Sequence, residues 1–269
     1  MNIKSKIYHD KASDRVYLSE FADVDFPIIL EYIHKLVIDN NYTKVFAKIP
    51  SKFLPAFLAD GYQIEAFIPD LYLTDDAAFL GKYYDINRNI RSESGLTILQ
   101  NLISQGSKEV NNLPTFPIEI LNHSHIPQMV GIFSEVFPNY PFPISDEKFL
   151  KRNMEDRETV YFGAFEGDNI IAISSAEIND NYKFAEMTDF AVLPSHRGQK
   201  LALILLKKME EMLIAEKYKM FFTIARLNSP SMNKTFLNNG YRYSGTLNNN
   251  TNISTGIESM NILYKAANK

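Results

Sequence analysis

The chain has no cysteine among its 269 residues. Disulfides, thiolate metal ligands and a cysteine nucleophile are therefore excluded. No apolar run approaches the roughly 18 residues needed to span a bilayer, and residues 1–15 lack the apolar core of a signal peptide. We expect a cytoplasmic protein that does not contact a membrane.

Basic clusters are absent as well. The net charge is -4 and the sequence has no long Lys/Arg run, which argues against general nucleic-acid binding. It also has no phosphate loop of the Gly-x-x-x-x-Gly-Lys type, no Gly-x-Ser-x-Gly elbow and no His-Glu-x-x-His pair. His123 and His125 lack a third ligand, so we expect a loop and helix cap there and no metal site.

The length exceeds what one ordinary core needs. The stretch Ser104–Pro117 is polar and contains Gly106, Pro114 and Pro117, which is typical of a linker. We therefore predict an N-terminal αβ domain at 1–110 and a second domain at 111–269.

Hydrophobic spacing in the second domain predicts the order βααβββαβαββ. The predicted strands are 116–121, 159–165, 169–177, 184–192, 220–225, 241–247 and 257–264. The predicted helices are 125–136, 146–154, 201–215 and 232–239. This order indicates an α/β (α+β) fold with a mixed sheet flanked by helices, and an Asn-rich turn at 248–253.

The N-terminal domain contains a sequence pattern that also occurs in the second domain. A strand at 45–49 followed by Phe57–Tyr62 parallels a strand at 222–226 followed by Phe236–Tyr241. We interpret this as a degenerate partial repeat, with chance similarity of two αβ units as the alternative. The first copy has no counterpart of Arg197-Gly198-Gln199, so we do not expect it to bind the same ligand.

The turn Arg197–Ala202 is the main chemical feature. A strand ends before it, Pro194 stops the ladder, and a helix is expected to begin near Gly198. Unpaired amides and the helix dipole favour an anion such as a pyrophosphate, and Arg197 and Lys200 add positive charge. The alternative is a basic helix start that holds no ligand.

The segment Arg197-Gly198-Gln199-Lys200-Leu201-Ala202 resembles the Arg/Gln-x-x-Gly-x-Gly/Ala signature of the GNAT acetyltransferase superfamily, with Lys200 in place of the middle glycine. The resemblance implies a mostly antiparallel, twisted sheet and acetyl-CoA as acetyl donor. In that family a splayed strand end binds the pantetheine arm like an added strand. The implied cofactor-binding residues are Phe190, Ala191, Val192, Arg197, Gly198, Gln199, Lys200, Leu201, Ala202, Asn228, Asn233 and Phe236.

The resemblance also implies the catalytic residues. Some members carry a general base four residues before Phe190, which is Glu186 here; a carboxylate in a cleft can take the proton of an amine. The alternative for Glu186 is a solvated residue or one that binds an ammonium group. Alternation places Glu186 and Thr188 on one face and Asp189 on the other. Phe236 occupies the position of the usual acid tyrosine, so Tyr241, Tyr243 or water is the proton donor.

The sequences of three segments resemble those of the β-lysine N-acetyltransferase family: Ala185–Phe190, Asn248–Ile253 and Gly256–Asn261. This implies acetylation of the side-chain amine of β-lysine, which yields the compatible solute Nε-acetyl-β-lysine. The candidate acceptor-binding residues are Asp189, Arg226, Asn249, Asn252 and Glu258. The alternatives are another small amine, a polyamine, a protein lysine, or a non-catalytic CoA-binding module. The N-terminal domain would serve as a wall of the acceptor pocket or as a homodimer surface.

Overall fold

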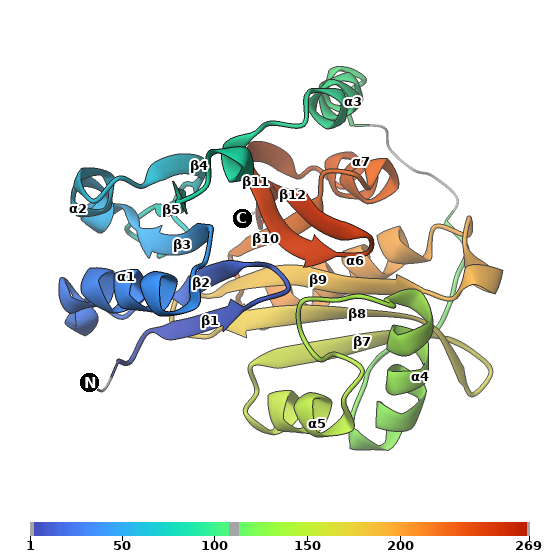
Figure 1. Cartoon of the computed structure of the whole chain (residues 1–269). Coiled ribbons are helices and arrows are strands. Elements are labelled where there is room, and N and C mark those ends of the chain that lie inside the picture. The colour runs from blue at the N-terminus through green and yellow to red at the C-terminus, as the bar shows by residue number, and fades with distance from the viewer. Residues whose placement is uncertain (1–2, 108–112, 268–269) are drawn as a thin grey trace. The chain divides into compact units, whose positions relative to one another are not determined.

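A computed structural model describes residues 3–107 and 113–267 (Figure 1). In the first part of the chain the elements are β1 (Lys6–Asp10), β2 (Arg15–Glu20), α1 (Ile28–Asn40), β3 (Lys44–Pro50), α2 (Leu54–Ala59), β4 (Gln63–Ile68), β5 (Ala77–Tyr83) and α3 (Glu93–Ser104). They are followed by β6 (Ile118–Ile120), α4 (Ile126–Val136), α5 (Glu147–Glu155), β7 (Thr159–Glu166), β8 (Asn169–Asn179), β9 (Phe184–Val192), α6 (Leu201–Ala215), β10 (Met220–Arg226), α7 (Pro230–Asn238), β11 (Arg242–Ile253) and β12 (Gly256–Ala266).

By its contacts, the chain divides into two compact units. Unit 1 comprises residues 1–96, 226–228 and 244–262, and unit 2 comprises 97–225, 229–243 and 263–269. The predicted linker lies partly in 108–112, outside the described residues. Unlike the predicted division at residue 110, the contact-based division assigns most of β11 to the unit that contains the N-terminal sheet.

Unit 1 contains a five-stranded sheet of order β1-β2-β3-β5-β4. Strands β2 and β3 are parallel, and the other neighbours are antiparallel. Alternate residues of β2 and β3, such as Val16 and Val45, are buried with Ile33 of α1 and Phe57 of α2. The helices α1 and α2 therefore cover one apolar face of this sheet.

Charged side chains from the N-terminal sheet bind β11. Lys44 is fully buried, contacts Glu65 at 3.0 Å and donates to the carbonyl of Asn248 at 2.7 Å. Arg15 donates to the carbonyl of Asn250 at 2.9 Å. Burial lowers the pKa of Lys44 to about 8, against the opposing effect of Glu65. The predicted Asn-rich turn is wrong: this segment is strand, because N-terminal residues satisfy its polar groups.

Asn249 shows the same point in detail. Its side-chain amide donates to the carbonyls of Asn87, Arg88 and Ile90 at 3.0–3.3 Å. In return Arg88 donates two hydrogen bonds to the carbonyl of Asn249. An Asn side chain that bonds to neighbouring backbone groups usually favours a turn. The Asn249 side chain bonds instead to backbone groups that are distant in sequence, so the segment can remain a strand.

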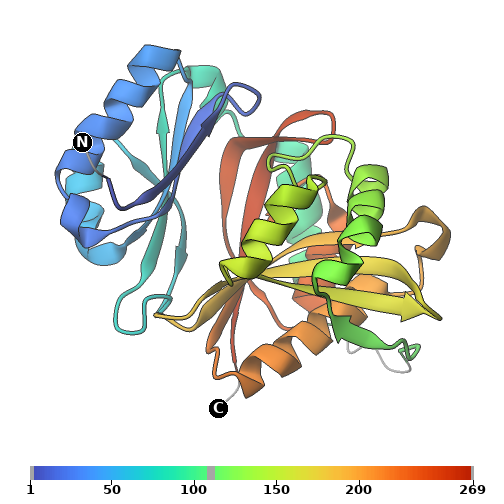
Figure 2. The same cartoon turned by 90° about the horizontal axis from the view of Figure 1, so that it is seen from below.

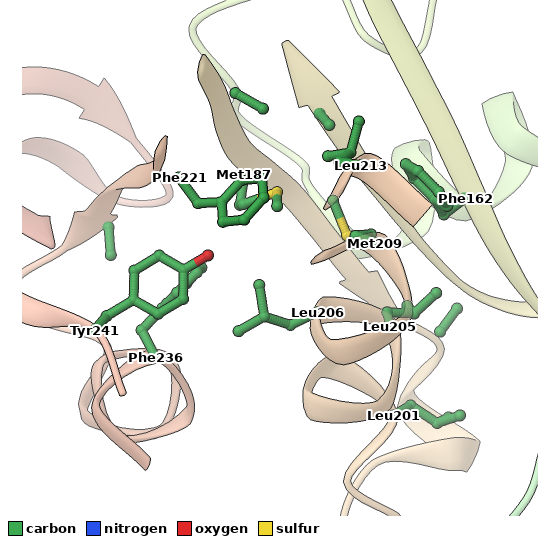
Figure 3. Close-up of a cluster of buried hydrophobic side chains, with 14 of the residues drawn as sticks. Phe162, Met187, Leu201, Leu205, Leu206, Met209, Leu213, Phe221, Phe236 and Tyr241 are labelled. Carbon is green, nitrogen blue, oxygen red and sulfur yellow. The ribbon is translucent and has the colours of Figure 1, made fainter. Parts of the chain in front are cut away.

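The second sheet has the order β11-β12-β10-β9-β8-β7-β6. In unit 2, β9 and β10 are parallel, whereas β6–β7, β7–β8 and β8–β9 are antiparallel. Helix α6 packs on one face in a cluster that includes Met187, Leu206 and Phe221 (Figure 3). Helices α4 and α5 supply Met129 and Leu150 to a separate cluster on the opposite face (Figure 2). The mixed sheet flanked by helices is the predicted fold.

The N-terminal sheet repeats part of the second one. Its order β1-β2-β3-β5-β4 is matched by β8-β9-β10-β12-β11, and β2–β3 and β9–β10 are both parallel. Gly61 and Gly240 have φ values of 88° and 86° after the short helices α2 and α7. The rings of Phe57 and Tyr62 lie 5.0 Å apart, and those of Phe236 and Tyr241 lie 4.9 Å apart. These correspondences support the interpretation as a degenerate repeat.

Most predicted boundaries in unit 2 are confirmed. Strand β9 has the predicted bounds, and the side chain of Asp146 caps α5 by accepting from the amide of Phe149 at 2.8 Å. His125 completes a capping box with Asn122 at the 3-10 helix His123–His125, which leads into α4, as expected of a loop and helix cap. The predicted helix 201–215 has the bounds of α6, whereas the second expectation, a helix start near Gly198, is wrong.

We predict that Lys44→Met destabilises the protein by about 3–5 kcal/mol, because it leaves the Glu65 carboxylate buried without its cation. Lys82→Met is the matched control, since Lys82 pairs with Asp60 at 2.9 Å at a more exposed position. That loss should cost about 0–1 kcal/mol. Chemical denaturation of both variants measures the difference, and equal effects would contradict the prediction.

Candidate active site

The end of β9 is irregular on its β8 side. Thr188 lies opposite Ser175 and Ala191 lies opposite Ile173, so β9 has one extra residue between these pairs. This is a β-bulge, and Asp189 within it has a φ of 53°. A bulge changes which face the following side chains occupy. Phe190 and Val192 therefore pack on the cluster of α6, as Met187 does before the bulge.

On its other side β9 separates from β10. Their parallel pairing joins Phe184–Glu186 to Met220–Phe222, although β9 continues to Val192 and β10 to Arg226. Backbone groups of the later part of β9 are thus available on that side to a bound chain. This part includes Phe190, Ala191 and Val192, the residues expected to hold the pantetheine arm.

The turn before α6 is lined by backbone amides. In the described part of the chain, the N–H groups of residues 198–202 donate to no protein acceptor, and the first amide bonded at this helix end is that of Leu203. Gly198 and Lys200 have φ values of 85° and 62°. Left-handed residues are typical of anion-binding nests, in which successive N–H groups line one concavity, so this turn suits an anion.

Charge and exposure at this turn also suit an anion. Arg197, Gly198, Gln199 and Lys200 are exposed, whereas Leu201 is buried and Ala202 half-buried under the start of α6. Lys200 is the N-cap of α6 and makes no side-chain cap bond. The family glycine is therefore replaced by a residue that adopts the left-handed conformation, so the amide orientation does not depend on glycine.

Glu186 lies on the face of β9 opposite α6. Its neighbours Ala185 and Met187 belong to the α6 cluster, while Glu186 is half-buried. Glu177 is its cross-strand partner on β8. Glu186 is the last residue of β9 that pairs with β10, so this carboxylate stands where the two strands part.

Asp189 does not take the face expected from simple alternation. Its carboxylate accepts hydrogen bonds from Ser175 and Tyr140, each at 2.5 Å. Ser175 is paired with Thr188, so Asp189 points to the same face as Thr188. The bulge is the reason, because its extra residue breaks the alternation of period two. Burial raises the pKa of Asp189, and the bonds from Ser175 and Tyr140 act in the opposite direction.

Helix α7 places Phe236 against β9. The ring of Phe236 is 1% exposed and meets that of Phe190 edge-on, with centroids 5.6 Å apart. Tyr241 also meets the ring of Phe236 edge-on and is drawn beside it in Figure 3. Burial, and the charge of Glu210, raise the pKa of Tyr241 well above its ordinary value. Asn233 is buried and its side chain donates to the carbonyl of Ser229 at 2.8 Å.

The remaining predicted residues belong to unit 1. Arg226 forms a two-point ion pair with Glu258, with contacts of 2.6 and 3.1 Å. The backbone N–H of Asn252 donates to the hydroxyl oxygen of Ser13 at 3.3 Å. Asn228 is exposed. Unit 2 thus assembles the predicted base and the other predicted cofactor residues, and unit 1 holds Asn228 and most predicted acceptor residues.

Two residues of the site were missed from sequence. Tyr140 lies between α4 and α5, outside every predicted helix and strand. Ser175 lies in β8, and its signal was a polar Ser-Ser pair inside an otherwise apolar run. Neither pattern by itself indicates a partner, since both residues meet Asp189 only through the fold.

A parallel strand pair that separates before an amide-lined helix start, within this mixed sheet, defines a GNAT-type acyltransferase fold. The model of the acetyltransferase (GNAT) family matches residues 126–234. The β-lysine N(6)-acetyltransferase of Methanococcus maripaludis is 33% identical over 256 residues, which cover 94% of this chain and 93% of that protein. The N-acetyltransferase YodP of Bacillus subtilis is 29% identical over 232 residues, covering 84% and 83%.

A solved structure agrees in fold. The ribosomal-protein-S18-alanine N-acetyltransferase of Escherichia coli has a TM-score of 0.50 at 16% identity, covering 56% of this chain and 94% of that chain. The chain therefore belongs to the acetyltransferase (GNAT) family and is an N-acetyltransferase. Within residues 3–107 and 113–267, no helix is long and apolar enough to cross a membrane, and no group of acidic or histidine side chains is arranged to hold a metal ion.

Lys200 provides a test of the turn geometry. We predict that Lys200→Gly is more stable than Lys200→Ala by about 0.5–1 kcal/mol, because only glycine adopts a φ of 62° without steric cost. Both variants remove the same charge, so each controls for the other in thermal unfolding. Equal stability of the two variants, or greater stability of the alanine variant, would show that the turn is not left-handed at this residue.

Proposed function

We propose that the chain transfers an acetyl group from acetyl-CoA to the side-chain amine of β-lysine. The observation that carries this proposal is the similarity over 94% of the chain to a β-lysine N(6)-acetyltransferase. The structure of unit 2 supports the donor half, since an amide nest and a separated strand suit a pyrophosphate and a pantetheine arm.

The cofactor contacts follow from the two backbone features. Amides of residues 198–202 would bind the pyrophosphate, with Arg197 and Lys200 adding positive charge. Phe190–Val192 would bind the pantetheine arm along the free side of β9. Asn228, Asn233 and Phe236 would border it from the loop and helix after β10. Acetyl-CoA would supply an acetyl group activated as a thioester.

In the proposed reaction, Glu186 is the general base. An amine near neutral pH is protonated and must lose a proton before it attacks a carbonyl carbon. Glu186 is half-buried at the point where β9 and β10 part, so its carboxylate can accept that proton directly or through one water. The chain has no cysteine, which favours direct attack by the amine without an acetylated cysteine.

The proton donor for the departing sulfur is a separate question. Phe236 has no hydroxyl, and Tyr241 holds its proton tightly because burial raises its pKa. A phenol with a raised pKa is a weak acid toward a thiolate. We therefore propose that Tyr243 or water serves instead.

The acceptor residues are proposed mainly from unit 1. Arg226 would bind the carboxylate of β-lysine and Glu258 an ammonium group, with each held in place by their ion pair at 2.6 Å. Asn252 would add a polar contact. The side chain of Asn249 already serves three carbonyls, so its contribution would be to hold β11. The product, Nε-acetyl-β-lysine, carries no net charge, as suits a compatible solute.

An amine panel tests this function. The purified protein is incubated with acetyl-CoA and with β-lysine, lysine, spermidine or a lysine peptide, and thiol release is followed. We expect the highest kcat/KM with β-lysine. A higher kcat/KM with another amine would show that β-lysine is not the preferred acceptor, while the proposal of an N-acetyltransferase would stand. Binding of CoA without turnover of any amine would favour the non-catalytic module.

We predict that Glu186→Gln lowers kcat by about 10²- to 10⁴-fold near neutral pH. The loss should shrink as the pH rises toward the amine's own pKa, because free amine then needs no base. Glu177→Gln is the matched control, since Glu177 lies directly across from Glu186 on β8. An unchanged pH–rate profile in Glu186→Gln would exclude Glu186 as the base.

A further inference from the structure

Four side chains meet at the bulge of β9. Tyr140, from the segment 137–146 between α4 and α5, donates its hydroxyl to Asp189 Oδ1 at 2.5 Å. Ser175 of β8 donates to Asp189 Oδ2 at 2.5 Å, and Thr188 makes a longer contact of 3.4 Å. One carboxylate thus joins β8, β9 and a segment that lies outside the sheet.

Hydroxyl donors within the protein already engage both carboxylate oxygens of Asp189. Each carboxylate oxygen already accepts one short bond, and all the donors are neutral hydroxyls. Among the residues described, none forms an ion pair with Asp189. A hydrogen bond from a hydroxyl to an ionised carboxylate is about twice as strong as one between two neutral groups. Ionised Asp189 would therefore hold Tyr140 and Ser175 strongly.

Tyr140 fixes the segment 137–146 to the face that carries Glu186. Its ring packs on Phe137 with centroids 4.8 Å apart, and Phe137 packs on Phe133 of α4. Asp189 and Thr188 occupy the same face as Glu186, opposite α6. Tyr140 and Glu186 are both half-buried, so this face is open to solvent in part.

We propose that Asp189 is a positioning residue, which acts through Tyr140 to hold segment 137–146 as a wall of the amine site beside Glu186. The proposal rests on the proposed function, in which Glu186 receives the proton of the amine. Asp189 itself does not contact the amine. Asp189 also lies within the bulge that turns Phe190 and Val192 toward the α6 cluster.

The main variant is Tyr140→Phe, which removes only the hydroxyl. We expect the KM for β-lysine to rise about tenfold, with kcat and the KM for acetyl-CoA changed less than twofold. Tyr218→Phe is the matched control, because Tyr218 donates to Asp180 at 2.8 Å at the opposite end of β9. It should leave both KM values unchanged.

Asp189→Asn separates positioning from direct binding. If Asp189 acts through Tyr140, adding Tyr140→Phe to Asp189→Asn raises the KM for β-lysine no further. If Asp189 binds the ammonium group, Asp189→Asn raises this KM whereas Tyr140→Phe alone does not. The second result would overturn the proposal.

Hydrogen exchange provides a readout that does not need turnover. Amides of 137–146 should exchange at least fivefold faster in Tyr140→Phe than in wild type, and at the wild-type rate in Tyr218→Phe. Unchanged exchange in Tyr140→Phe would overturn the proposal that Tyr140 anchors segment 137–146, whatever the KM values are. Faster exchange with an unchanged KM for β-lysine overturns the role in the acceptor site. Failure of the wild type to turn over any amine, with normal exchange, counts against the proposed function and not against the anchor.

Discussion

The separation of β9 from β10 is the constraint on which the site depends. The two strands pair with each other at Phe184–Glu186 and Met220–Phe222, and beyond these residues each is paired only with its other neighbour in the sheet. Unpaired backbone groups are costly when buried, so the open side of β9 needs either water or a bound chain to satisfy its N–H and C=O groups. The bulge at Asp189 contributes by turning Phe190 and Val192 toward α6. The chain then leaves β9 directly into the amide-lined turn, which brings both cofactor features onto one strand and its exit.

The N-terminal unit shows the same fold without this constraint. Its parallel pair β2–β3 stays in register from Arg15 to Leu18, across most of β2. The loop before α1 carries Asp23 and Asp25 where unit 2 has Arg197 and Lys200, and Asp25 accepts hydrogen bonds from the amides of Lys4 and Ser5. The loop before the helix thus carries negative charge in this copy, which does not suit an anionic ligand. This copy retains the architecture, and its charged face binds β11 instead.

Much of the fold was readable because its signals are local. Helical spacing predicted the bounds of α6, and runs of β-branched and aromatic residues predicted β7–β9. The anion-binding turn was also readable, since glycine, positive charge and a helix start are adjacent in sequence. The prediction of a turn in the Asn-rich segment is wrong because the partners that hold it as a strand, Arg15, Lys44 and Arg88, lie more than 150 residues away in sequence. Asp189 was placed on the wrong face because a bulge depends on strand pairing and leaves no mark in a pattern of period two.

The sequence by itself determined the family, the order of helices and strands in the second predicted domain, the turn that suits a pyrophosphate and the carboxylate proposed as base. Each of these rests on residues that are neighbours along the chain. Only the tertiary structure decided that Asp189 binds Tyr140 and Ser175, that Asn249 holds β11, and that Arg226 pairs with Glu258. The reason is physical: a polar side chain takes whichever donor or acceptor the fold brings within about 3 Å, and that choice is made between segments far apart in sequence.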